Sequence, residues 1–258
     1  PIPTPCGRAE VPVVQRAETH LVRRMEFDDA YCGCDGLSQT GLPDPAKKEE
    51  PGEAWRFMAE TVKRFPGQVS IISLAPMTNL ALMIQNDPAA ALAAAGIYTI
   101  AGSYGLRPDY ENLNPRPEWN LAQDPEAAAV FGSGIPITAA GLDVTRRLDN
   151  SMMDRLLARA GENEKTKFLR RAVQFNLDHG LEPYSLLVDS AAVCLALCPE
   201  IAKTVSGHVI VETRGEYTTG QTLFGNSGRF KKQGSFVQAA WDYDWEKLLS
   251  FLEKRVFS

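Results

Sequence analysis

The chain has 258 residues, and 27 Lys and Arg against 32 Asp and Glu give it a formal net charge of −5. This acidic balance and the presence of only three histidines argue against a basic nucleic-acid-binding face and a polyhistidine metal scaffold. With 44% hydrophobic and 23% charged residues, the composition is that of a globular protein with a sizeable core. No run approaches the roughly 18 apolar residues of a membrane span. We therefore expect a small-molecule partner, with no nucleic acid and no membrane.

The cysteines are few and unevenly spaced. Five occur, at positions 6, 32, 34, 194 and 198, which is an odd number in a chain too large to depend on a disulfide framework. We expect reduced thiols and, because the N-terminus lacks a basic-then-apolar leader pattern, a cytoplasmic location. A zinc site built from the last four is an alternative, although their spacings are not those of zinc knuckles. Cys194 and Cys198 share an apolar helical face, which favours thiols in the core.

Helical and extended patterns alternate after an irregular region that extends to about residue 52. Apolar residues recur every three or four positions after Glu53, and Pro66-Gly67 ends that helix. We then expect a buried strand at 69–74, helices at 78–86 and 88–95, a strand at 97–100, a helix that begins with Asp-Pro-Glu at 124–126, and a strand at 135–139. Beyond these we expect a helix opened by a capping box of Ser151 and Asp154, helices at 166–179 and 190–197, strands at 208–212 and 236–240, and a helix at 245–256.

Strands separated by helices predict an α/β fold with an open, mainly parallel sheet and helices on both faces. We see no internal repeat and no break in composition, so we expect residues 1–258 to form a single domain. Ligands of such sheets bind beyond the carboxyl ends of the strands. The loops after Leu74, Ile100 and Ala139 are therefore where we expect the chemistry.

The most specific polar segment runs from 112 to 126. Asn112, Glu118 and Asn120 lie in a proline-stiffened loop that follows a strand and precedes a helix. Amides and a carboxylate at fixed positions suit the recognition of sugar hydroxyls, and positions 118 and 120 would point the same way in extended backbone. A polar surface loop whose asparagines serve turns is the alternative.

Several motifs follow one another in a set order. They are Leu-Ala-Pro-Met-Thr-Asn-Leu-Ala at 74–81, the segment 112–120 with Asp-Pro-Glu-Ala-Ala at 124–128, Gly-Leu-Asp-Val-Thr at 141–145, and Val-Asp-Ser-Ala-Ala-Val at 188–193. In this order they resemble the inosine/uridine-preferring nucleoside hydrolases, and Cys-Gly-Cys-Asp-Gly-Leu at 32–37 is similar to that family's His-Gly-x-Asp-Gly-Leu segment. The resemblance extends from about residue 11 to the C-terminus and implies a nucleoside hydrolase-like, Rossmann-like core.

The resemblance implies hydrolysis of the N-glycosidic bond of a ribonucleoside to free base and ribose, as in purine and pyrimidine nucleoside catabolism. It implies a Ca²⁺ ion bound by the Thr78 carbonyl, by Asp189 and by an N-terminal aspartate cluster, since calcium takes six to eight oxygen ligands. It assigns Asn112, Glu118 and Asn120 to the ribose, with Asp189 also at the substrate, and implies a homodimer or homotetramer. A helix cap is the alternative role for both Thr78 and Asp189.

The sequence departs from the family pattern in three places. The Asp-x-Asp-x-Gly-x-Asp-Asp turn, which supplies the general base and most calcium ligands, is absent, so we assign no catalytic residue. Val188 and Cys32 stand where the family has histidines. We interpret the missing turn as truncation: the first βα unit is expected to be missing, and the chain to be a fragment or an incomplete gene model. Tight calcium binding, or release of ribose, by this chain alone would contradict that interpretation.

The leading hypothesis is an N-ribohydrolase. A non-catalytic descendant that uses the sheet and the sugar loop for binding or assembly is the runner-up, because Val188 and Cys32 replace histidines, whereas the retained residues at 112, 118 and 120 favour the enzyme. An unrelated α/β ligand-binding domain is the third possibility. The base preference is not determined, although Val188 argues against purine specificity, because the family's histidine there assists departure of the base. We expect the glycine-rich segment 215–228 to be a loop near the pocket mouth, and Phe168, Phe175 and Tyr184 to belong either to a flap over the base or to helix packing.

Overall fold

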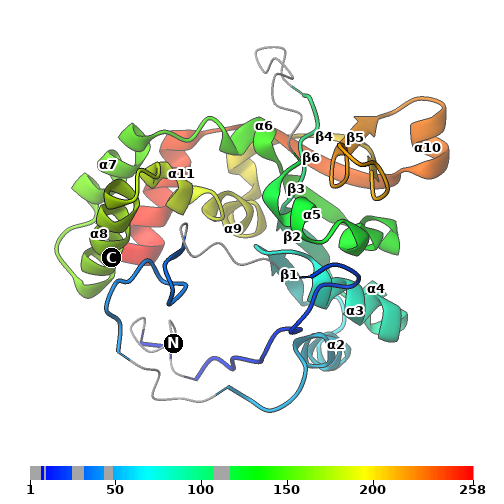
Figure 1. Cartoon of the computed structure of the whole chain (residues 1–258), viewed down its shortest axis with the longest axis horizontal. Helices are drawn as coiled ribbons and strands as arrows, with labels where there is room; N and C mark the ends of the chain where they lie inside the picture. Colours follow the sequence, from blue (N-terminus) through cyan, green and yellow to red (C-terminus); the bar gives the residue numbers. More distant parts are fainter. Residues whose placement is uncertain (1–6, 9, 25–31, 44–48, 107–116, 258) are drawn as a thin grey trace.

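The computed structural model describes residues 7–8, 10–24, 32–43, 49–106 and 117–257 (Figure 1). The strands of the described sheet are β1 (Ser70–Ser73), β2 (Gly96–Ile100), β3 (Ile137–Ala140), β4 (Ala202–Val211), β5 (Thr222–Gly225) and β6 (Ser235–Tyr243). Their order in the sheet is β1-β2-β3-β6-β4-β5. The neighbours β1, β2, β3 and β6 are parallel, whereas β4 is antiparallel to both β6 and β5. The predicted open, mainly parallel sheet is therefore confirmed.

Helices cover both faces of this sheet. They are α2 (Ala54–Arg64), α3 (Thr78–Asn86), α4 (Pro88–Leu92), α5 (Trp119–Gln123), α6 (Leu142–Thr145), α7 (Asn150–Arg159), α8 (Glu164–Asp178), α9 (Ser190–Leu197), α10 (Arg229–Gln233) and α11 (Trp245–Leu252), with 3₁₀ turns η1 (Pro125–Ser133), η2 (Pro183–Leu187) and η3 (Pro199–Ile201) and a π turn η4 (Glu253–Phe257). The bounds predicted for α3 and α9 coincide with those observed. Within the described residues, no helix combines the length and the apolar character that crossing a membrane requires.

The alternation of side chains along the strands divides the core into two clusters. Ile97 and Ile137 pack into one cluster with α2, α3, α4 and η1. Ile100 and Ala140 pack into the other, with α7, α9 and α11. Successive strand residues face opposite sides of a sheet, so these buried residues on β2 and β3 require a helical layer on each face.

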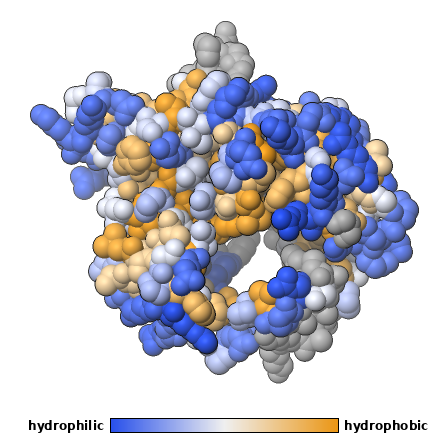
Figure 2. All heavy atoms as spheres, turned by 180° about the vertical axis from the view of Figure 1, so that it is seen from behind, coloured by the Kyte–Doolittle hydropathy of each residue, from blue (hydrophilic) through white to orange (hydrophobic). Residues whose placement is uncertain are grey.

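The strand β1 differs from its prediction. The apolar run at 69–74 predicts a buried strand, but Ile72 and Leu74 each remain 36% exposed. The reason is that β1 is an edge of the described sheet and pairs only with β2. In Figure 1 the described N-terminal segment passes on the side of β1 that has no strand partner, and the space-filling view in Figure 2 shows that the molecule is hollowed.

The polar segments contain more structure than their sequences predict. Residues 215–228 were expected to be a loop, but β5 lies there because it pairs with the long strand β4. The predicted capping box of Ser151 and Asp154 is wrong. Asp149 caps α7 instead, since its carboxylate accepts hydrogen bonds from the Met152 amide and the Ser151 hydroxyl.

The thiols are placed as the helical pattern predicts. Cys194 is buried in the core and Cys198 packs against it, whereas Cys32 and Cys34 are exposed. All four are free. Burial raises the pKa of the Cys194 thiol to about 12, because the low-dielectric interior disfavours a thiolate. Cys6 lies outside the described residues.

Candidate active site

The Glu118 carboxylate joins the N-terminus of α5 to the end of β2. Its Oε1 accepts a hydrogen bond of 2.9 Å from the Asn120 amide, and its Oε2 accepts bonds of 3.3 Å from the amides of Leu121 and Gly102. Glu118 is therefore the N-cap of α5, and its side chain is 4% exposed. Gly102 lies two residues beyond the last residue of β2, so the carboxylate lies at the carboxyl end of the parallel strands, where ligands of such sheets bind.

Asn120 is held at the same strand end. It is buried in the first turn of α5, and its Nδ2 donates a hydrogen bond of 3.0 Å to the carbonyl of Ile100. The backbone is extended at Glu118 but helical from Trp119 onward, because capping by Glu118 starts a helix there, so the alternation of side chains along a strand does not apply to residues 118 and 120. The helix nevertheless keeps both polar side chains at one end of β2. Asn112 lies outside the described residues.

Asp189 presents an open carboxylate. It occupies the position before α9, but its side chain makes no capping hydrogen bond, and its φ of −67° and ψ of −26° are already helical. The alternative role of a helix cap is therefore wrong. No other described side chain or backbone amide hydrogen-bonds its carboxylate. Val188, which precedes it, is half-buried and packs against the second core cluster, and its hydrocarbon side chain has no acidic proton to give to a substrate.

Two carboxylates with raised pKa values share this end of the sheet. Burial raises the pKa of Glu118 to about 7, and the negative charge of Asp189 raises it further, against the opposing effect of the three backbone amides. Packing around the carboxylate also raises the pKa of Asp189 to about 6, although the residue as a whole is exposed to solvent. Perturbed acids of this kind gather at functional sites, where their charge acts on a ligand.

Thr78 forms a hydrogen bond with a buried aspartate. Its Oγ1 donates a hydrogen bond of 2.6 Å to Oδ2 of Asp124, which also accepts from the backbone amide of Leu21 at 3.2 Å. Thr78 is the first residue of α3 and Met77 is the N-cap, so the capping alternative for Thr78 is wrong. Asp124 was predicted to cap the helix that Pro125 begins. It occupies that position, but its side chain reaches across to Thr78, and the element that follows is the 3₁₀ turn η1.

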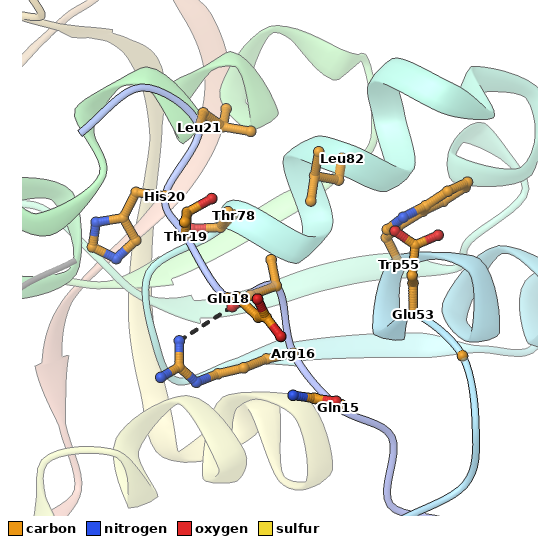
Figure 3. A pocket seen from close by; sticks show the side chains of 12 residues that line it. Gln15, Arg16, Glu18, Thr19, His20, Leu21, Glu53, Trp55, Thr78 and Leu82 are labelled. Atoms are coloured by element: carbon orange, nitrogen blue, oxygen red, sulfur yellow. Dashed lines mark hydrogen bonds between the residues drawn. The ribbon is translucent and has the colours of Figure 1, made fainter. Parts of the chain in front are cut away.

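A cavity of about 470 Å³ opens beside Thr78 (Figure 3). Its lining comes from three parts of the chain, namely the N-terminal segment with Arg16, Glu18 and His20, the start of α2 with Trp55, and α3. Glu118, Asn120 and Asp189 do not line it. The polar site is therefore identified by the burial and hydrogen bonds of its side chains, not by this cavity.

Calcium is the ion that the family resemblance implies, and the described residues do not complete a site for it. The Thr78 hydroxyl is used by Asp124, which leaves the Thr78 carbonyl and the open Asp189 carboxylate as donors. In the described part of the chain, no three His, Cys, Asp or Glu side chains are gathered closely enough to hold a metal ion. A carbonyl and a carboxylate are donors of the kind that calcium accepts, but the ion requires six to eight oxygens, so these two groups could supply only a minority of its ligands. The same finding leaves the four-thiolate zinc alternative without support among the described residues.

Comparison with known proteins decides the family. The sequence profile described as inosine-uridine preferring nucleoside hydrolase matches residues 4–250. The chain belongs to this family. It is a nucleoside hydrolase, an enzyme class that cleaves the N-glycosidic bond of ribonucleosides, and the third hypothesis of an unrelated ligand-binding domain is excluded.

Individual relatives agree with the profile. The chain is 34% identical over 223 residues to the pyrimidine-specific ribonucleoside hydrolase RihA of Citrobacter koseri, an alignment that covers 84% of this chain and 70% of the relative. A RihA from Salmonella schwarzengrund is 35% identical over 222 residues, with the same coverage. The plant nucleoside hydrolase PpNRh1 superposes with a TM-score of 0.83 at 26% identity, over 98% of this chain and 82% of the plant enzyme. The purine-preferring ribonucleoside hydrolase of Gardnerella vaginalis shares the fold, with a TM-score of 0.82 at 24% identity and the same coverage.

Sequence reasoning missed two buried acids at this end of the sheet. Asp124 was interpreted as a helix cap, and Asp143 belongs to the Gly-Leu-Asp-Val-Thr motif but was given no role. Both are at most 3% exposed. An acidic residue directly after a strand or before a proline was the available signal, but only the fold reveals which distant amide or hydroxyl it binds.

Proposed function

We propose that Glu118, Asn120 and Asp189, together with Asn112, bind the ribose of a nucleoside at the carboxyl end of β2. The observation that carries this proposal is the buried Glu118 carboxylate, whose pKa is raised to about 7 beside the charge of Asp189. A carboxyl group poised in this range can donate or accept a hydrogen bond, as a sugar hydroxyl requires. Asn120 adds its Oδ1 and the amide hydrogen that Ile100 does not use.

The same charges favour bond cleavage. As the glycosidic bond breaks, the ribose develops positive charge in an oxocarbenium-like transition state. Carboxylates held by the fold beside the ring stabilise this charge more than they stabilise the neutral substrate, which is the condition for lowering the barrier. Glu118 is fixed by three backbone amides, so its carboxylate needs little reorganisation during the reaction. The general base stays unassigned.

For the base we propose pyrimidine nucleosides, with uridine as the representative substrate. Two observations support this proposal. The relatives at 34–35% identity are named as pyrimidine-specific, and Val188 offers no acid to a departing purine. A pyrimidine can leave without that residue if negative charge develops on its own carbonyl oxygens. Release of base from uridine at a rate well above that from inosine is expected, and a preference for inosine would contradict this choice.

We keep Ca²⁺ as the proposed ion, with the Thr78 carbonyl and Asp189 as two of its ligands. When bound, such an ion would hold ribose hydroxyls and a water molecule, since calcium accepts oxygen ligands of all these kinds. We further propose a single domain, a cytoplasmic location, with which the free thiols agree, and an assembly of two or four copies. Light scattering of the purified protein measures the number of copies in the assembly.

The test compares three variants of the full-length protein. Glu118→Gln and Asn120→Ala each remove hydrogen bonds to a sugar, so we expect KM for uridine to rise by about 10-fold to 100-fold. Glu126→Gln is the matched control, because Glu126 forms an ion pair with Arg23 on the surface. Ribose release is measured with a reducing-sugar assay. Unchanged KM and kcat in both site variants would overturn the ribose assignment, and binding of uridine without release of ribose would favour the non-catalytic alternative.

A further inference from the structure

The loop that follows β2 is held by a second buried carboxylate. Oδ2 of Asp143 accepts a hydrogen bond of 2.6 Å from the amide of Tyr104, and its Oδ1 accepts one of 2.8 Å from the amide of Leu106. Asp143 is 3% exposed and lies in α6, directly after β3. Both of its oxygens therefore act on backbone of the neighbouring loop, and not on its own helix.

Two further amides of this loop are bound in the same way. The amide of Ser103 donates to Oγ1 of Thr222 at 2.8 Å, and the Thr222 hydroxyl donates back to the Ser103 carbonyl at 2.5 Å. The amide of Gly102 donates to Glu118. Side chains from three separate elements, α6, β5 and the cap of α5, thus bind four amides of one short loop, those of residues 102, 103, 104 and 106.

The backbone of the loop is also packed against the end of β3. The Gly102 carbonyl accepts a hydrogen bond of 2.8 Å from the amide of Leu142. A Cβ atom on Gly141 would lie 2.6 Å from that carbonyl oxygen, so only glycine allows this approach. Gly102 itself has a φ of +80°, a conformation that glycine adopts without strain. Gly102 is therefore fixed through both its amide and its carbonyl.

We propose that Asp143 and Thr222 are positioning residues of the ribose site. By fixing the backbone of residues 102–106, they hold the Gly102 amide against Glu118 and thereby orient the carboxylate that binds the sugar. This inference rests on the proposed function of Glu118. Neither residue is assigned a contact with substrate; each acts through the loop, which precedes the segment that contains Asn112.

The chemistry of substitution makes the proposal specific. The side chain introduced by Asp143→Asn has one acceptor oxygen, so it can accept a hydrogen bond from only one of the two loop amides. Its NH₂ group is a donor and cannot bind the other amide. Valine at position 222 has the shape of threonine but neither donates nor accepts, whereas serine keeps the hydroxyl. Asp143→Asn and Thr222→Val are thus expected to loosen the loop, and Thr222→Ser to leave it close to its normal state.

Hydrogen exchange of backbone amides tests the proposal without requiring catalysis. In Asp143→Asn and Thr222→Val, we expect amides of residues 102–106 to exchange about tenfold faster, and the effect to reach the Asn120 and Leu121 amides, which bind Glu118. Asp244→Ala is the control for a general loss of stability, since Asp244 caps the remote helix α11. Normal exchange at 120 and 121 in both loop variants, or equal acceleration in Asp244→Ala, would overturn the proposal.

Steady-state kinetics of the full-length protein with uridine provide the second measurement. The loop variants are expected to raise KM for uridine about tenfold with a smaller change in kcat, and Thr222→Ser is expected to restore the normal KM. Failure of Glu118→Gln to change KM would refute the ribose assignment. A large effect of Glu118→Gln together with no effect of the loop variants on exchange or KM would refute only the positioning role.

Discussion

The Thr78 hydroxyl donates a hydrogen bond of 2.6 Å to Oδ2 of Asp124, a carboxylate that is completely buried. The same oxygen accepts the amide of Leu21. One carboxylate therefore connects the start of α3, the start of η1 and the N-terminal segment, which are far apart in the sequence. Oδ1 of Asp124 has no hydrogen-bond partner among the described residues, so the two bonds to Oδ2 are the ones that offset burial of the group.

Thr78→Val is expected to lower the free energy of unfolding by about 2 kcal/mol, because it removes a hydrogen bond to a buried carboxylate and leaves only Leu21 as a donor. Urea unfolding followed by circular dichroism measures the change. Thr78→Ser keeps the hydroxyl and is the control, with an expected loss below that of valine. Equal stability of the valine variant and the parent protein would show that this bond contributes nothing.

Stability is expected to fall as the pH rises from about 4.5 to about 7. The folded protein raises the pKa of Glu118 from 4.5 to about 7, so in this interval the unfolded chain has released a proton that the folded protein retains. The stabilising contribution of the protonated group is complete below pH 4.5 and is lost as the pH rises through 7, with an expected size of about 3 kcal/mol.

Thermal unfolding of the parent protein and of Glu118→Gln across this pH range checks that prediction. Glutamine does not titrate, so its stability profile is expected to be flatter, although it starts lower because one oxygen that accepts backbone amides is replaced by a donor. Asp189 contributes in the same direction but much less, because it is exposed to solvent, which screens its charge. Parallel profiles for the two proteins would mean that Glu118 ionises normally in the folded state.

Asp189→Ala is expected to abolish calcium-dependent release of ribose while changing the free energy of unfolding by less than about 1 kcal/mol. The reason is that the Asp189 side chain makes no capping hydrogen bond and has a pKa raised to about 6, so the fold gains little from its charge. Calorimetric titration with Ca²⁺ and a ribose assay, both on the protein as its gene encodes it, measure the effect. Asp154→Ala is the matched control, since Asp154 is exposed on α7. Unchanged turnover would remove Asp189 from the site.

Iodoacetamide at pH 8 is expected to modify the exposed Cys34 within minutes and to leave Cys194 unmodified in the folded protein. Cys194 is buried and its pKa is raised to about 12, so almost no thiolate forms at that pH, whereas Cys34 is exposed. Mass spectrometry of the digested protein locates the label. The same experiment in urea is the control, where Cys194 should react as well. Rapid labelling of Cys194 without denaturant would indicate that α9 opens readily.

Local sequence patterns correctly predicted the helices whose start and end depend only on nearby residues. The helices α3 and α9 have the predicted bounds, because apolar spacing and flanking breakers act over a few residues. Patterns that depend on distant partners failed. The strand β5 forms because β4 provides a ladder for it, and the exposure of β1 depends on which strands flank it.

The sequence by itself determined the family, the parallel sheet and the residue types at positions 78, 118, 120 and 189, because ordered motifs preserve identity without coordinates. Only the tertiary structure decided what those side chains do. Glu118 caps α5 and also accepts a hydrogen bond from the Gly102 amide beyond β2. The Thr78 hydroxyl donates to Asp124, whereas the Asp189 side chain makes no capping hydrogen bond. The physical reason is that a buried polar group takes whichever donor or acceptor the folded chain brings within hydrogen-bond distance, and most of these partners lie far away in the sequence.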